Sequence, residues 1–180
     1  MDSVTRILNI AEVRMRRVGY NAVSFRDIAA EMGIKSASLH YHFPKKENLG
    51  AALVQRYSEN FMALLNTRTD SITDPAEKIA AFTRIYRDSL GENQMICLCA
   101  MLGAENSSLP DGVSTEVRAA IADQINWLAR QYQAIGQADP VAAAQTMIAL
   151  LQGAMIQSGL YGNADPFRAA EKQIASSLNC

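Results

Sequence analysis

The chain has 180 residues, 49% of them hydrophobic, which is enough to bury a substantial core. Charged residues make up 19%, too few for a disordered polyelectrolyte, and the formal net charge of -1 excludes a uniformly basic nucleic-acid binder. The charge is nevertheless uneven. Residues 1–50 hold eight Lys/Arg against five Asp/Glu, whereas residues 51–180 hold nine against thirteen. A polyanionic partner is therefore expected to meet the N-terminal segment alone.

Composition also bounds the secondary structure and the compartment. Gly and Pro number only ten and five, and Ala, Leu, Ile and Met are abundant, so helices are favoured over sheets. The longest apolar run, Met95–Ala104, is about half the length of a membrane span, so no membrane partner is expected. Cys97, Cys99 and Cys180 cannot all pair within one chain, and no secretory segment precedes them. We therefore expect a cytoplasmic protein with reduced thiols.

Apolar residues recur at spacings of three and four along most of the chain, which predicts an all-α fold of about nine helices without strands. The first helix is expected to begin at a Ser3 cap and to end at Gly19. Ser24 followed by Asp27 is typical of a capping box, and Pro44 ends the third helix. In chain order, the predicted helices are 4–18, 25–32, 36–42, 45–66, 74–90, 94–105, 114–136, 140–161 and 166–178.

The later helices carry further start and packing signals. Three of them begin with an aspartate that caps the helix and a proline at the first helical position. These pairs are Asp74-Pro75, Asp139-Pro140 and Asp165-Pro166. The 45–66 helix is expected to pack along one side through Leu49, Leu53, Tyr57, Phe61 and Leu64. The 94–105 helix is apolar nearly all round, which predicts burial on several sides, and 107–112 is predicted to be a loop.

The segment 19–49 has the pattern of a helix-turn-helix. Ala29 is small enough for two short helices to approach closely, and Gly33 suits the left-handed backbone of the turn. The side chains expected to point inward are Ile28, Met32, Ile34 and Leu39. The outward side chains of the second helix are small, polar or cationic, and two lysines with free backbone amides follow. The candidate DNA-binding residues are Ser24, Lys35, Ser36, Ala37, Ser38, His40, Tyr41, His42, Lys45 and Lys46.

The stretches Phe25-Arg26-Asp27-Ile28-Ala29, Gly33-Ile34 and Leu39-His40-Tyr41-His42-Phe43-Pro44-Lys45-Lys46-Glu47-Asn48-Leu49 resemble the N-terminal signature of the TetR family of transcriptional regulators. The resemblance implies a homodimeric repressor, with a DNA-binding domain at 1–45 and a ligand-binding and dimerisation domain at 46–180. It further implies a palindromic double-stranded operator and release by a small hydrophobic effector. Two residues depart from the family pattern. Lys35 replaces the usual Ser or Thr, so that Ser36 or water is expected to cap the recognition helix, and His40 replaces a common Tyr.

An effector is expected to occupy a mostly apolar cavity with few polar groups, which favours a neutral or weakly polar organic molecule. The candidate ligand-binding residues are Phe82, Tyr86, Gln94, Met95, Cys97, Leu98, Met101, Ile121, Gln124, Trp127, Leu128 and Met147. Cys97 and Cys99 leave open a repressor that senses electrophiles or oxidants, although thiols in an apolar helix also pack as small hydrophobes. A constitutive DNA binder without an effector is a third possibility, but DNA binding alone needs no large apolar body.

No catalytic residue, metal or cofactor is expected. A Cys97 nucleophile would need a basic partner, and both histidines lie in the N-terminal segment. His40 and His42 are two residues apart on a predicted helix, so their side chains diverge, and no third ligand lies nearby.

The 140–161 helix is expected to form a four-helix bundle with its symmetry mate, together with the 166–178 helix. The 114–136 helix is the alternative second partner. The candidate dimer-interface residues are small or apolar and recur at packing spacing: Ala144, Met147, Ile148, Leu151, Ala154 and Met155.

Overall fold

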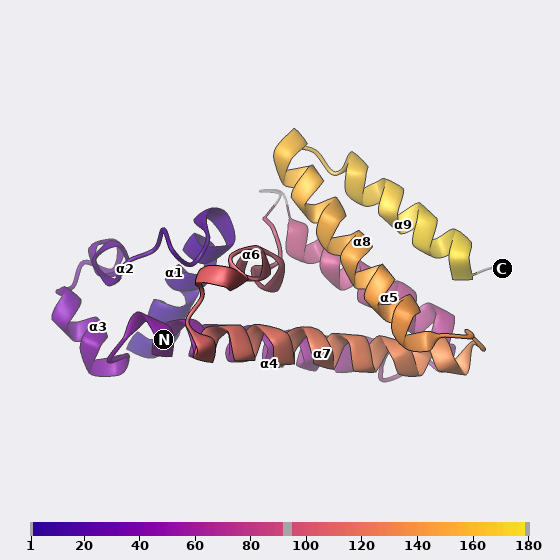
Figure 1. Cartoon of the computed structure of the whole chain (residues 1–180), viewed down its shortest axis with the longest axis horizontal. Helices are drawn as coiled ribbons and strands as arrows, with labels where there is room; N and C mark the ends of the chain where they lie inside the picture. Colours follow the sequence, from indigo (N-terminus) through magenta and orange to yellow (C-terminus); the bar gives the residue numbers. More distant parts are fainter. Residues whose placement is uncertain (1, 92–94, 179–180) are drawn as a thin grey trace. The chain divides into compact units, whose positions relative to one another are not determined.

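The computed structural model describes residues 2–91 and 95–178, and these contain nine α-helices, one 3-10 turn and no strand (Figure 1). The predicted all-α fold is therefore confirmed. The elements are α1 (Ser3–Val18), α2 (Phe25–Met32), α3 (Ser36–His42), α4 (Lys46–Thr69), α5 (Pro75–Leu90), α6 (Leu98–Ala104), η1 (Asn106–Ser108), α7 (Asp111–Ala134), α8 (Pro140–Tyr161) and α9 (Asp165–Leu178). None of the helices in the described ranges is long and apolar enough to cross a membrane.

The chain divides into two compact units. Unit 1 comprises Met1–Glu59 and Leu98–Ala120, and unit 2 comprises Asn60–Cys97 and Ile121–Cys180. Helices α4 and α7 each contribute residues to both units. These boundaries differ from the predicted functional boundary at residue 45, because α6 and the start of α7 group with the N-terminal helices. The functional division at residue 45 stays a prediction.

Unit 1 is built around the buried face of α1. Ile7, Ala11 and Met15 are fully buried there. Arg56 of α4 ties that helix to α1, because its guanidinium lies 3.1 Å from the carboxylate of Glu12. The helix starts one residue earlier than predicted and is capped by Asp2 instead of Ser3. The Asp2 carboxylate accepts a hydrogen bond from the Thr5 backbone N–H at 2.9 Å, and this bond lowers the pKa of Asp2.

Other helix starts also differ from the predicted positions. Helix α6 begins at Leu98, and the predicted start at Gln94 lies outside the described residues. Helix α7 begins at Asp111, inside the segment predicted to be a loop, because the Ser114 N–H already donates to the Pro110 carbonyl at 3.0 Å.

The Asp-Pro starts are confirmed for α5 and α8 but not for α9. Asp74 and Asp139 each accept a backbone N–H in the first turn of their helices. Asp165 lies inside α9 instead, where its carboxylate pairs with Arg168. The side chain of Asn163 accepts the Asp165 N–H at 2.9 Å and takes over the predicted role of the aspartate.

Unit 2 packs α8 against α9 and α5, and α8 and α9 run side by side (Figure 1). From α4 it buries Phe61 and Leu65. The prediction that Leu64 faces inward is wrong, since its side chain is 40% exposed while that of Leu65 is 0% exposed. The helix therefore turns a slightly different face to the core after Phe61 than the sequence spacing indicated.

This pair of neighbouring leucines provides a matched test of the core. Leu65→Ala should lower the free energy of unfolding by about 2–5 kcal/mol, because it removes a fully buried side chain and leaves a cavity. Leu64→Ala should lower it by less than about 1 kcal/mol, because water already reaches that side chain. Urea denaturation followed by circular dichroism measures both values. Equal losses for the two variants would contradict the orientation of α4.

Candidate nucleic-acid interface

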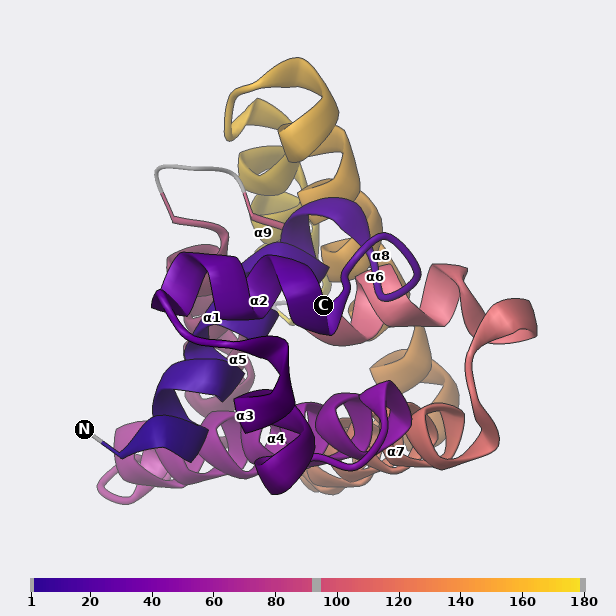
Figure 2. The same cartoon turned by 90° about the vertical axis from the view of Figure 1, so that its left-hand side faces the viewer.

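Helices α2 and α3 are joined by a tight turn whose geometry the backbone fixes (Figure 2). Gly33 has the left-handed φ of 69°, which a residue with a side chain adopts only at a cost. The next N–H, of Ile34, donates to the Ala29 carbonyl at 3.0 Å and closes the end of α2. At the other end, Ser24 and Asp27 form the predicted capping box, whose hydrogen bonds lower the pKa of Asp27.

The interior of this helix pair follows the prediction at three of four positions. Ile28 and Leu39 are fully buried and Met32 is nearly so. Ile34 is 37% exposed, so its expected inward position is wrong. It lies in the turn itself, where the chain leaves α2 before α3 begins.

The outer face of α3 is exposed. Within α3, all of whose residues the structure describes, Leu39 is the one fully buried side chain, and Tyr41 is 85% exposed. The ring of His40 is held at the edge of this face, 4.8 Å from the Phe25 ring, with Nδ1 3.2 Å from the Pro44 carbonyl oxygen. Of the two caps expected for α3, Ser36 or water, Ser36 is excluded because it lies within the helix. The N-cap residue is Lys35, whose side chain makes no capping hydrogen bond.

The two lysines at the start of α4 have different surroundings. Lys45 is exposed, and its backbone N–H donates to Asn48 Oδ1 at 3.1 Å. The Lys46 ammonium is part-buried and donates to the carbonyls of Tyr20 at 3.1 Å and Val23 at 3.0 Å. Burial lowers the pKa of Lys46, and the Glu105 carboxylate opposes that effect. The sequence pattern gave no sign of these partners, which lie more than 20 residues away along the chain.

Several predicted ligand-binding residues come together in unit 2. The rings of Phe82 and Tyr86 stack 5.3 Å apart, and Trp127 stacks on Phe82 at 5.9 Å. The Tyr86 hydroxyl donates to Gln124 Oε1 at 2.6 Å, which pairs two polar groups inside this apolar cluster. Phe61, which the sequence did not single out for this site, joins the cluster edge-on.

The other predicted ligand-binding residues are more scattered. Leu128 and Met147 are buried in unit 2, whereas Met95 and Ile121 of the same unit are partly exposed. Leu98 and Met101 belong to unit 1, and Gln94 lies outside the described residues.

Both thiols in the described ranges are buried, at 3% exposure for Cys97 and 2% for Cys99. Cys97 precedes α6 instead of lying within it, so the expectation that both belong to one helix is wrong. Cys180 lies outside the described residues. Burial restricts the access of an oxidant to either thiol.

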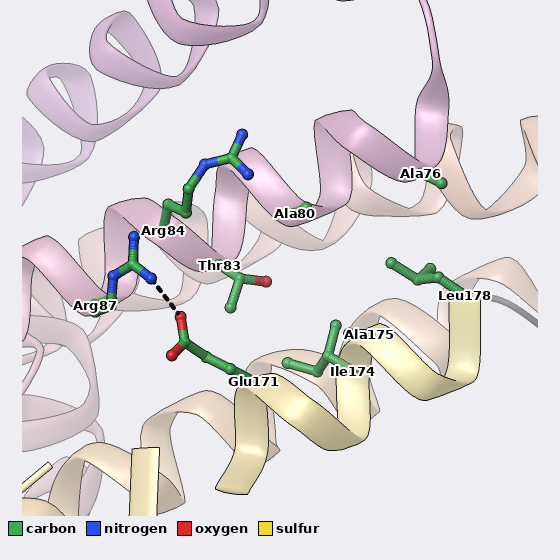
Figure 3. Close-up of a pocket in the computed structure, with 9 residues that line it drawn as sticks. All are labelled: Ala76, Ala80, Thr83, Arg84, Arg87, Glu171, Ile174, Ala175 and Leu178. Carbon is green, nitrogen blue, oxygen red and sulfur yellow. Dashed lines mark hydrogen bonds and ion pairs between the residues drawn. The ribbon is translucent and has the colours of Figure 1, made fainter. Parts of the chain in front are cut away.

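A groove of about 370 Å³ separates part of α5 from α9 (Figure 3). Its lining is mostly aliphatic, with Ala80 and Ile174 on opposite sides. The Arg87 guanidinium lies 3.3 Å from Glu171 and links the two helices at one end, while Figure 3 shows the Arg84 guanidinium directed away from α9. None of the predicted ligand-binding residues that the structure describes lines this groove. A second pocket, of about 270 Å³ beside α8 and α9, includes Met147.

The six candidate dimer-interface residues face the interior of their own chain. All are buried in the single protomer, so they cannot form the contact surface that was predicted: Ala144, Met147, Ile148, Leu151, Ala154 and Met155. The prediction failed because α8 is apolar on several sides, and its spacing does not identify the inward face. The exposed large apolar side chains of α8 are Val141, Ile156, Leu160 and Tyr161.

Comparison with known proteins places this geometry in a family. The family described as "Bacterial regulatory proteins, tetR family" matches residues 7–53. The transcriptional regulator AcuR of Cereibacter sphaeroides is 27% identical over 165 residues, covering 84% of this chain and 74% of AcuR.

Solved structures extend the similarity over both units. A TetR transcriptional regulator from Legionella pneumophila is 29% identical with a TM-score of 0.93, and the match covers 98% of this chain and 97% of that one. A TetR-family regulator from Agrobacterium tumefaciens is 30% identical with a TM-score of 0.91, covering 97% and 96% of the two chains. The chain belongs to the TetR family of DNA-binding transcriptional regulators, as shown by its helix-turn-helix with an exposed α3 and by this similarity over the full length.

Proposed function

We propose that the chain is a ligand-responsive repressor that binds a palindromic operator as a homodimer in the cytoplasm and is released by a small organic effector. The outer face of α3 carries this proposal. Its side chains are small, polar or aromatic and exposed, while Leu39 and the Gly33 turn fix the helix from behind. A recognition helix needs this combination, because base edges in the major groove are read by projecting side chains on a rigid support.

Phosphate contacts in the proposal come from the flanks of α3. Lys45 is exposed beside the start of α4, where backbone N–H groups also favour an anion. The Lys46 ammonium already donates to backbone carbonyls, so we assign the phosphate contact to Lys45 and a supporting role to Lys46.

Dimerisation is assigned to the outer face of α8. This helix of 22 residues has no charged side chain, and Leu160 and Tyr161 near its end are 77% and 66% exposed. Exposed apolar side chains on a helix without charge suit a self-complementary interface, because pairing with a second copy removes them from water.

The effector is proposed to act on the aromatic cluster of Phe61, Phe82, Tyr86 and Trp127. The Tyr86–Gln124 hydrogen bond supplies one polar pair in otherwise apolar surroundings, which suits a neutral organic molecule. The effector shifts a population between two dimer states, one of which holds the recognition helices about 34–36 Å apart. Thiol sensing stays the alternative, although the burial of both thiols gives it less support, and constitutive binding is the outcome if no effector exists.

The DNA assignment predicts distinct behaviour for two exposed lysines. Lys45→Ala should weaken binding to operator and random DNA alike and should reduce the slope of log affinity against log salt by about one, because one phosphate contact is lost. Lys172→Ala, on the exposed side of α9, should leave the slope unchanged. Fluorescence anisotropy over a salt series measures both slopes, using the duplex that the wild-type protein selects from a random library. The proposal fails if the protein enriches no duplex.

The dimer assignment separates the two faces of α8. Leu160→Glu should give a folded monomer, because it places a charge on the exposed face. Leu151→Glu should unfold the protein, because the charge would enter the core of its own protomer. Sedimentation and circular dichroism distinguish these results. A wild-type monomer at micromolar concentration, or a dimeric Leu160→Glu variant, would refute this interface.

The effector assignment has a built-in reporter, since Trp127 is the one tryptophan in the chain. Within a panel of apolar compounds and mild oxidants, those that release the operator should also change Trp127 fluorescence, because they bind against its ring. The same compounds should act on a Cys97→Ser/Cys99→Ser variant. Release by oxidants in the parent alone would favour thiol sensing, and release without any change in fluorescence would exclude the aromatic cluster.

A further inference from the structure

The turn between α1 and α2, residues 19–24, is held by opposite charges on its two sides. Helix α1 ends at Val18, so the backbone groups that follow need partners outside the helix. The Glu105 carboxylate accepts the Tyr20 N–H at 2.7 Å and the Asn21 N–H at 3.4 Å. The Lys46 ammonium donates to the carbonyls of this same turn. The backbone N–H groups of the turn thus donate to a carboxylate, and its carbonyl oxygens accept from an ammonium group.

The fit around this turn leaves little space. Gly19 has a φ of 82°, and a Cβ at that position would collide with the Glu105 carboxylate. On the other side, the Tyr20 ring lies 4.3 Å from the Lys46 ammonium. A Cβ on Gly50 of α4 would come within 2.8 Å of the Tyr20 ring. A shift of Glu105 or of the start of α4 therefore has to move the turn or break these contacts.

The two charged groups come from segments that are remote in sequence but belong to the same unit as the turn. Glu105 directly follows α6, which packs on α1, and Lys46 is the first residue of α4. A further bond joins the Asn21 side chain to Ser108 of η1 at 2.8 Å. The turn leads directly into Ser24, the N-cap of α2. The place where α2 begins is thus set by the end of α6 and the start of α4.

We propose that Glu105 is a positioning residue for operator recognition: it orients the α2–α3 pair through the α1–α2 turn and does not itself contact DNA. This inference rests on the proposed function as an operator-binding regulator. Reading bases requires α3 to enter the groove at one angle, whereas contacts with the phosphate backbone tolerate reorientation. Loss of Glu105 should therefore reduce operator affinity more than affinity for random DNA.

Two variants of Glu105 should reduce operator affinity to different extents. Glu105→Ala removes the acceptor, which leaves the Tyr20 N–H unpaired and Lys46 without its nearby carboxylate. Glu105→Gln keeps an oxygen acceptor but loses the charge, so it should rescue part of the function. Glu116→Ala is the matched control, because it removes one carboxylate from α7 in the same unit without touching the turn.

The experiment compares affinities for the duplex selected by the wild-type protein and for a random duplex, at one salt concentration and well below the melting temperature of every variant. Glu105→Ala should bind the selected duplex roughly tenfold more weakly and random DNA within about twofold of the parent. Glu105→Gln should fall between, and Glu116→Ala should match the parent. Hydrogen exchange at the Tyr20 and Asn21 amides, measured without DNA, should be faster in Glu105→Ala.

Two results would overturn the positioning role: parental operator affinity in Glu105→Ala, or equal losses for both duplexes. If the wild-type protein selects no duplex, the proposed function fails separately, and hydrogen exchange alone decides whether Glu105 holds the turn. Unchanged exchange at Tyr20 in Glu105→Ala would then refute the contact itself.

Discussion

A helix of seven residues is not stable in water by itself, because nucleation costs more free energy than so few hydrogen bonds return. Helix α3 must nevertheless leave most of its surface bare, and Leu39 is its one fully buried side chain. Its support therefore comes from outside: the left-handed turn at Gly33, the capped helix α2, and the Phe25 ring against His40. Much of unit 1 can be understood as the means of holding these supports in one geometry.

The second constraint is that α8 is apolar on more than one side. One side fills the core of unit 2 through side chains such as Leu151, and the other leaves Ile156 and Leu160 exposed. A single helix can thus stabilise its own protomer and offer a surface to a second copy. The proposed dimer follows from the exposed side, because the buried one is already occupied.

The sequence predicted the parts of the fold that depend on neighbours along the chain. The capping box at Ser24 and the glycine turn at Gly33 are local, and both are confirmed. Features set by distant partners were missed: Lys46 donates to carbonyls more than 20 residues away, and Glu105 contacts a turn 85 residues away. Apolar spacing also selected Leu64 where the structure buries Leu65, because positions three and four residues after Phe61 are both compatible with a helical core face.

In the proposed complex, the outer face of α3 meets DNA. A photo-crosslinking amino acid in place of Tyr41, which is 85% exposed on that face, would report this contact. The control is the same substitution at Lys172, which is exposed on α9. Position 41 should crosslink to bases of the selected duplex, and position 172 should not. Crosslinks from position 172, or none from position 41 while the protein stays bound, would show that α3 is not the DNA-contacting helix.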